Sequence, residues 1–263
     1  MDMGLTGRVA IVAASSTGLG RAVAEGLAAE GAHLALCSRS LAKLEPTAAA
    51  IAHRSKGRVM ARAVDVTDAA AVEQFVQAVV AEYGRLDICV TNAGGPPAKN
   101  FASTTLAEWR AACELNLLSH VSFAKAVLPY MQRARWGRFL MITSVAVKQP
   151  IDGLILSNAV RSAVLGLTRS LANEYGRDGV LVNNVCPGYT LTERLTELAK
   201  VKGLASGKDQ EASYREWAAM TALDRLAEPR EFADAVVYLA SERASYITGQ
   251  SLLVDGGFYK GTG

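Results

Sequence analysis

The sequence predicts a doubly wound α/β domain in which a seven-stranded parallel sheet lies between two layers of helices, a three-layer sandwich. Two observations lead to this prediction. Short apolar runs alternate with longer segments of helical periodicity along the chain, which is typical of parallel strands joined by crossover helices. The 263 residues are half hydrophobic, which suits one domain with a large core. We therefore expect residues 1–263 to form a single domain.

The first part of the chain should form three strands and two helices. Val9–Ala13 is short and uniformly apolar, as in a strand buried on both faces. Gly18–Glu30 has helical periodicity, and the glycine that follows should end this helix. His33–Cys37 and Val59–Val64 are the next two predicted strands, and they flank a second helical segment, Leu41–Arg54.

The middle of the chain continues the alternation. A helix capped by Thr67 or Asp68 should run to about Tyr83, where the next glycine should end it. Leu86–Thr91 is the fourth predicted strand. The helical pattern of Leu106–Arg133 predicts one long helix over that range.

The last part of the chain adds three strands and an insert. We expect strands at Gly137–Ser144, Val180–Cys186 and Ser251–Val254, with a helix at Asn158–Tyr175. Thr190–Leu226 breaks the rhythm, because it is long, charged and helix-prone. Inserts beyond the carboxyl ends of parallel strands tend to cover the ligand, so we interpret residues 190–226 as a substrate lid. An ordinary helical excursion on the surface is the alternative.

Composition and charge argue against several classes of function. The formal net charge is +3 and the basic residues are scattered, so a nucleic-acid partner has little support. Met1–Gly7 is too short and polar for a signal peptide, and no apolar stretch is long enough to span a membrane. We therefore expect a cytoplasmic protein without a membrane partner. No metal site is expected, because the cysteines and histidines are isolated in the sequence: Cys37, Cys89, Cys113, Cys186, His33, His53 and His120.

The turn after the first predicted strand is typical of a dinucleotide site. A helix N-terminus presents free N–H groups and a partial positive charge, which suit a pyrophosphate. Glycines in such a turn let the ligand approach the backbone, although a Gly-x-Gly also serves tight strand–helix packing. The position of the turn in the first strand–helix unit therefore carries the prediction of Rossmann-type nucleotide binding. Its candidate contacts are Ser15, Thr17, Gly18, Leu19 and Gly20.

Further short motifs occur along the chain in a fixed order. They are Asp65-Val66, Thr91-Asn92-Ala93-Gly94, Leu115-Asn116-Leu117, Pro187-Gly188, Thr248-Gly249-Gln250 and Asp255-Gly256-Gly257. Together with the first turn, they resemble the short-chain dehydrogenase/reductase family over nearly the whole chain. Members that act as 3-oxoacyl-[acyl-carrier-protein] reductases are the most similar in pattern. The resemblance implies a nicotinamide cofactor and an oxidoreductase that acts on a carbonyl/alcohol (CH–OH) substrate.

The resemblance also implies where the cofactor lies. The pyrophosphate would lie at the first turn, and the adenine would contact Asp65 and Val66. Ala14 departs from the family pattern, because a glycine usually occupies this position. The ribose and nicotinamide side would be lined by residues that follow the fourth and sixth strands: Asn92, Ala93, Gly94, Pro187, Gly188, Thr190 and Thr192.

The end of the second predicted strand bears on the choice between the two nicotinamide cofactors. An acidic residue there would bind the ribose 2′-hydroxyl and repel a 2′-phosphate. This chain has Ser38 and Arg39 instead. Serine can donate to a phosphate and arginine can bind one bidentately. We therefore predict NADP(H) in preference to NAD(H), although a solvated Arg39 is the alternative.

The predicted catalytic centre departs from the family in two positions. The resemblance places the family's serine at Ser144 and its supporting asparagine at Asn116. Its tyrosine falls on Ser157 and its lysine on Arg161. A tyrosine has a pKa of about 10, whereas a serine hydroxyl is a far weaker acid, and arginine stays charged.

Some of the family's chemistry could survive these two changes. Arg161 could still bind the nicotinamide ribose and stabilise an oxyanion, and Ser144 and Ser157 could hold a carbonyl. The family's proton donor is missing. Lys148 and Tyr189 are candidate replacements, although a surface lysine and a pocket-shaping tyrosine are the plainer interpretations.

Two functions from different classes therefore remain open. The first is an atypical NADP(H)-dependent reductase of a small-molecule carbonyl or acyl thioester, such as a 3-oxoacyl thioester. The second is a cofactor-binding protein without redox turnover, a sensor or scaffold. A dehydratase or epimerase on the same fold also stays open. The resemblance implies a homotetramer or homodimer, which the apolar ending Ile247–Phe258 fits.

Overall fold

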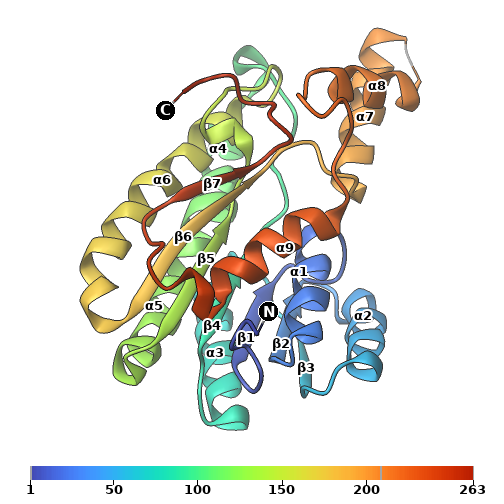
Figure 1. The fold of residues 1–263 in the computed structure, drawn as a ribbon. Helices are drawn as coiled ribbons and strands as arrows, with labels where there is room; N and C mark the ends of the chain where they lie inside the picture. The colour runs from blue at the N-terminus through green and yellow to red at the C-terminus, as the bar shows by residue number, and fades with distance from the viewer. Residues whose placement is uncertain (1, 208, 263) are drawn as a thin grey trace.

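The computed structural model describes residues 2–207 and 209–262 (Figure 1). Its seven-stranded sheet is parallel throughout and has the order β3-β2-β1-β4-β5-β6-β7, as predicted. The order reverses between β1 and β4, which is where ligands bind in doubly wound sheets. The strands are β1 (Val9–Ala13), β2 (His33–Ser38), β3 (Val59–Ala63), β4 (Ile88–Thr91), β5 (Gly137–Ile142), β6 (Val180–Pro187) and β7 (Ser251–Val254).

Helices cover both faces of the sheet (Figure 1). One layer contains α1 (Gly18–Ala29), α2 (Leu41–Arg54) and α9 (Pro229–Ala240). The opposite layer contains α3 (Ala69–Tyr83), α5 (Ser119–Ala134) and α6 (Ile155–Tyr175), and α4 (Leu106–Cys113) packs on α6. Two further helices, α7 (Glu193–Ser206) and α8 (Gln210–Ala219), lie beyond the carboxyl end of β6. Within the described residues, no helix is long and apolar enough to cross a membrane.

The central strand shows why the sequence folds this way. All five residues of β1 are buried, because helices cover both of its faces. Ala10 and Val12 belong to the core beneath α1, α2 and α9. Ile11 and Ala13 belong to the core on the opposite side. The uniformly apolar run therefore fills two cores at once, and its carboxyl end is left at the edge where the site lies.

Several helix boundaries differ from the prediction. The helix expected at Leu106–Arg133 is interrupted by a π-helical turn at Glu114–Leu118. Such a turn inserts an extra residue and is common at functional sites; here it carries Asn116, which is fully buried. The helix expected from Asn158 begins at Ile155.

Local capping explains where α3 begins and ends, and why a helix that was not predicted, α9, forms. Asp68, rather than Thr67, caps α3 by accepting from two backbone N–H groups at 3.0 Å. Gly84 ends that helix in the left-handed conformation, as predicted. The helix α9 was not predicted, although Pro229 at its first turn and the capping box of Glu228 and Glu231 are start signals.

Candidate active site at the carboxyl edge of the sheet

The first turn keeps an open helix N-terminus. Thr17 precedes α1 in an extended conformation, and no side chain caps the helix, so its first N–H groups are left for a ligand. A Cβ atom at Gly20 would lie 2.3 Å from the Ala14 carbonyl oxygen, so only glycine fits there. A Cβ atom at Gly18 would meet only the Thr192 side chain, at 3.6 Å. The geometry of this turn fits a pyrophosphate, and the start of the predicted lid lies beside it.

Ala14 adopts a backbone conformation that favours glycine. Its φ is +49°, in the left-handed region, where a Cβ atom crowds the carbonyl oxygen. The replacement Ala14→Gly should therefore stabilise the fold by about 1 kcal/mol, measured as a shift in the urea midpoint. Ala29→Gly, at the exposed end of α1, is the control and should destabilise by a similar amount. A loss of stability in both variants would contradict the prediction.

The residues predicted at the adenosine side are placed together at the ends of β2 and β3. Ser38 pairs with Ala63 in the sheet register. Its hydroxyl donates to the Ser40 carbonyl at 2.9 Å, whereas Arg39 is exposed. Hydrogen bonds from Thr67 lower the pKa of the Asp65 carboxyl, and the charge of Arg39 adds to the effect. Arg39 therefore lies near Asp65 with its guanidinium accessible.

Two of the other predicted contacts are occupied by the protein itself. Ser15 is fully buried, and its hydroxyl donates to the Cys37 carbonyl at 3.4 Å. Thr192 caps α7 by accepting from the Leu195 N–H. The remaining predicted cofactor contacts lie along this edge, at the carboxyl ends of β1, β3, β4 and β6, in the loops that follow them, or in the first turn of α1: Thr17, Gly18, Leu19, Gly20, Val66, Asn92, Ala93, Gly94, Pro187, Gly188 and Thr190.

The centre of the site is a buried guanidinium. Arg161, on the inner face of α6, is only 5% exposed. It donates to the carbonyls of Ile142 and Thr143 at the end of β5, at 3.4 and 3.2 Å. It also donates to Ala93 and Gly94 after β4, at 3.5 and 3.3 Å. Burial, together with the charge of Arg194, lowers the pKa of Arg161 to about 10. Arg161 thus remains charged at neutral pH.

The three other predicted catalytic residues lie around Arg161. Asn116 donates from its side-chain amide to the Gly94 carbonyl at 2.9 Å, which is the same oxygen that Arg161 binds. Ser144 follows Thr143 directly, and its hydroxyl accepts from the Ala146 N–H at 3.1 Å. Ser157 is buried on α6, one turn before Arg161. The structure therefore brings all four residues together where β4 and β5 end.

His120 is a residue of this centre that the sequence did not single out. It is fully buried, and its Nδ1 lies 2.6 Å from the Thr91 hydroxyl. Burial lowers the pKa of His120 to about 3, and the charge of Arg161 adds to this effect, so the ring is neutral at physiological pH. In the described part of the chain, His120 Nε2 and Asn116 Oδ1 have no partner. The four-residue spacing from Asn116 was the available signal, because it places both side chains on one helix face.

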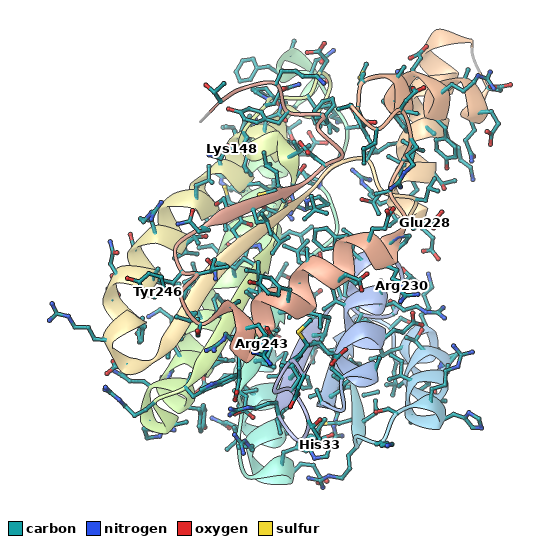
Figure 2. All side chains as sticks on the ribbon, viewed as in Figure 1. His33, Lys148, Glu228, Arg230, Arg243 and Tyr246 are labelled. Carbon is teal, nitrogen blue, oxygen red and sulfur yellow. The ribbon has the colours of Figure 1, made fainter. Side chains whose placement is uncertain are left out.

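The two candidate proton donors have different surroundings. Burial raises the pKa of Tyr189 to about 12, and the charge of Asp152 contributes, which makes the phenol a weaker acid. Its ring stacks on Trp217 at 5.1 Å and meets the edge of Phe258 at 5.1 Å. Lys148 is exposed near the carboxyl end of the sheet, whereas His33 and Arg243 lie toward the opposite end (Figure 2). Because the phenol of Tyr189 is a weakened acid, Lys148 is the better candidate of the two.

The predicted lid is anchored on both sides of the site. Beside β6, Tyr189 and Trp217 form an apolar cluster with Leu195 and Ala199. On the side of β4, Arg194 in the first turn of α7 donates to the Pro96 carbonyl at 2.7 Å. The segment therefore reaches from the sixth strand across to the loop after β4, as a covering segment would.

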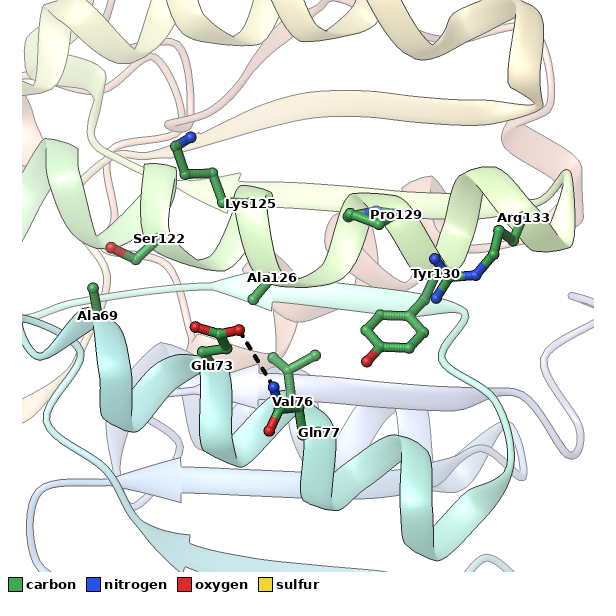
Figure 3. Close-up of a pocket in the computed structure, with 10 residues that line it drawn as sticks. All are labelled: Ala69, Glu73, Val76, Gln77, Ser122, Lys125, Ala126, Pro129, Tyr130 and Arg133. Carbon is green, nitrogen blue, oxygen red and sulfur yellow. Dashed lines mark hydrogen bonds between the residues drawn. The ribbon is translucent and has the colours of Figure 1, made fainter.

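A cavity lies away from this site, between two helices of one layer. This cavity, of about 360 Å³, separates α3 from α5 (Figure 3). None of the predicted site residues contributes to it. Its lining is Ala69, Glu73, Val76, Gln77, Ser122, Lys125, Ala126, Pro129, Tyr130 and Arg133.

Known proteins resemble the chain over its whole length. The family model described as enoyl-(acyl carrier protein) reductase matches residues 13–259. The chain is 34% identical to 3-oxoacyl-[acyl-carrier-protein] reductase FabG of Vibrio cholerae over 257 residues, which is 98% of this chain and 99% of that protein. FabG of Escherichia coli gives the same identity and coverage.

Solved structures give the same result. L-sorbose reductase from Gluconobacter frateurii, complexed with NADPH and L-sorbose, superposes with a TM-score of 0.95 at 33% identity, and all of both chains is covered. YwfH, an NADPH-dependent reductase involved in bacilysin biosynthesis, has a TM-score of 0.92 at 26% identity and covers 97% of this chain and 99% of its own.

Proposed function

Because this chain belongs to the short-chain dehydrogenase/reductase family of oxidoreductases, we propose that it reduces a small-molecule carbonyl with NADP(H) at a non-standard centre. The observation that carries the proposal is the position of Arg161. Its guanidinium binds the backbone beside Ser144 and shares the Gly94 carbonyl with Asn116. These contacts support a role for Arg161 as the cation beside which a substrate carbonyl oxygen would develop negative charge.

The chemistry of each side chain in the centre suggests a role for it in the proposed reduction. NADPH, when bound, supplies a hydride. The hydroxyls of Ser144 and Ser157 would hold the substrate carbonyl, and Arg161 would stabilise the developing oxyanion. Asn116 would position Arg161 through their common partner, Gly94. Lys148 would deliver the proton, either directly or through water.

The oxidation of NADPH across a panel of ketones, oxo acids and 3-oxoacyl thioesters tests this function. A reductase would be supported if any substrate is turned over and the Ser144→Ala variant loses this turnover. Tight binding of NADPH without oxidation on any member of the panel would favour the second function, a cofactor-binding sensor or scaffold. The absence of a phenol at position 157 is the observation that favours this alternative.

We also propose that NADP(H) is preferred over NAD(H) because Arg39 is available to the 2′-phosphate. The replacement Arg39→Ala should weaken NADPH binding by about tenfold and leave NADH binding nearly unchanged. Fluorescence titration of both cofactors measures this. Arg54→Ala, at the other end of α2 and also exposed, is the matched control. Tighter binding of NADH than of NADPH by the native chain would contradict the preference.

Exposed apolar side chains support a homo-oligomer. Phe101, in the short turn before α4, is 73% exposed, and Leu106, at the start of α4, is 74% exposed. Tyr246 is fully exposed just before the edge strand β7, on which Leu252 is also exposed. Burying such groups against a second copy removes apolar surface from water. We propose a tetramer or dimer, and light scattering that gives a monomer mass would exclude it.

A further inference from the structure

The buried guanidinium of Arg161 lacks a negative partner in the described residues. All four of its hydrogen bonds go to neutral backbone carbonyls. The Cys186 thiol lies nearby, but burial raises its pKa, so it stays neutral and supplies no counter-charge. Buried charges are normally paired, because desolvation of an ion is costly.

A second guanidinium, that of Arg194 in α7, contacts the same loop after β4 that Arg161 binds. Arg194 donates to the Pro96 carbonyl at 2.7 Å, and Arg161 donates to Gly94, two residues earlier. Two residues span at most about 7 Å between their Cα atoms, so the two cations flank one segment. A Cβ atom at Gly95 would lie 2.9 Å from Arg194 Nε, which shows how closely Arg194 crosses this loop. The charge of Arg194 accordingly lowers the pKa of Arg161.

Two nearby acidic residues among the described ones, Glu197 and Asp152, do not neutralise the pair. Glu197 is the ion-pair partner of Arg194, but the contact is 3.4 Å long and the carboxylate is 66% exposed, so solvent screens it. The nearby carboxylate of Asp152 acts on Tyr189. On the substrate side, Lys148 contributes a third positive charge, which reaches Cys186.

Building on the reductase function proposed above, we infer that the substrate is an oxo acid whose carboxylate binds Arg194, next to the buried charge of Arg161. A carboxylate accepts two parallel hydrogen bonds from a guanidinium such as that of Arg194, and its negative charge would offset the repulsion between Arg194 and Arg161. Arg194 is 39% exposed, so it can leave the Pro96 carbonyl for an incoming anion. A neutral ketone has no carboxylate, so it would gain neither these hydrogen bonds nor the charge compensation.

Binding of matched alcohols to the NADPH-loaded full-length protein tests the inference without any turnover. D-Gluconate and D-glucitol form one pair, and (R)-3-hydroxybutyrate and (R)-1,3-butanediol form another. Within each pair, a carboxylate replaces a hydroxymethyl group. Titration calorimetry should show at least one acid bound about tenfold more tightly than its neutral partner, and the preference should shrink as the salt concentration rises.

Two variants locate the effect. Arg194→Met should abolish the preference for the acid and leave binding of the neutral alcohol unchanged. Arg215→Met removes an exposed arginine from the other lid helix, α8, and should keep the preference. Equal binding within both pairs, including no binding of any member, would overturn the inference. So would an Arg194→Met variant that loses affinity for NADPH but keeps the acid preference, because Arg194 would then serve the cofactor.

This test separates the inference from the proposed function. Acid preference in binding, without NADPH oxidation on any oxo acid, would support the carboxylate site and contradict the reductase. Oxidation of NADPH by neutral ketones, without any acid preference, would support the reductase and contradict the carboxylate site.

Discussion

A variant that carries both Ser157→Tyr and Arg161→Lys should reduce carbonyl substrates about 10²- to 10⁴-fold faster than the native chain. The reason is the proton. A phenol has an ordinary pKa of about 10, which a neighbouring ammonium lowers toward neutrality, whereas a serine hydroxyl does not donate in this range. Ser157 and Arg161 lie one turn apart on the inner face of α6. The new phenol and ammonium would therefore face the same centre.

The measurement is kcat for NADPH oxidation with any accepted carbonyl, as a function of pH. Ser157→Phe with Arg161→Lys is the matched control, because it has the same ring without the hydroxyl group and should gain nothing. An unchanged kcat in the tyrosine variant would mean that proton delivery is already efficient in the native chain. In that case Lys148→Met should lower the native rate, which would identify Lys148 as the donor.

Gly20→Ala should destabilise the fold by about 2–3 kcal/mol and weaken NADP(H) binding. The added Cβ atom would lie 2.3 Å from the Ala14 carbonyl oxygen and 2.9 Å from its carbonyl carbon. Both are backbone atoms, so no flexible side chain can move aside. Relief requires that α1 shift away from the end of β1. The shift would also displace the N–H groups that we expect to receive the pyrophosphate.

Gly166→Ala is the matched control for this effect. Gly166 lies inside α6, and no atom lies within 4 Å of the position of an added Cβ. Alanine there should stabilise the fold by about 0.5–1 kcal/mol, because it is the better helix former. Urea unfolding of both variants gives the comparison, and cofactor titration gives the second readout for position 20. Equal stability of the two variants would contradict the steric argument.

Much of the fold could be predicted from local patterns. The strand β1 matches its predicted bounds because a uniformly apolar run of five residues has no other stable place than the centre of the sheet. The end of α3 was predicted from Gly84, whose left-handed conformation is a local property. In contrast, the π-helical turn around Asn116 has no distinct signal, because its other residues are Glu and Leu, which are ordinary helix formers. The extra residue there follows from how α4 and α5 pack on different partners.

The candidate site also has a part that the sequence predicts and a part that only the packing of the chain decides. Motif spacing along the chain was enough to identify the family. The row of cofactor contacts and the substitutions at 157 and 161 stay predictions from the same spacing. The neighbours of Arg161 were not predictable from the sequence, because its carbonyl partners at Ala93 and Gly94 lie 68 and 67 residues away. The partner of Arg194 lies 98 residues away.

The sequence by itself therefore determined the fold class and the family, because apolar periodicity, turn glycines and motif spacing are local properties of the chain. Only the tertiary structure decided that two arginines bind the same loop, that His120 is buried near the charge of Arg161, and that Ser15 is fully buried. These relations depend on how α6, α7 and the loop after β4 pack together. Burial and charge pairing are set by that packing, which no short stretch of sequence encodes.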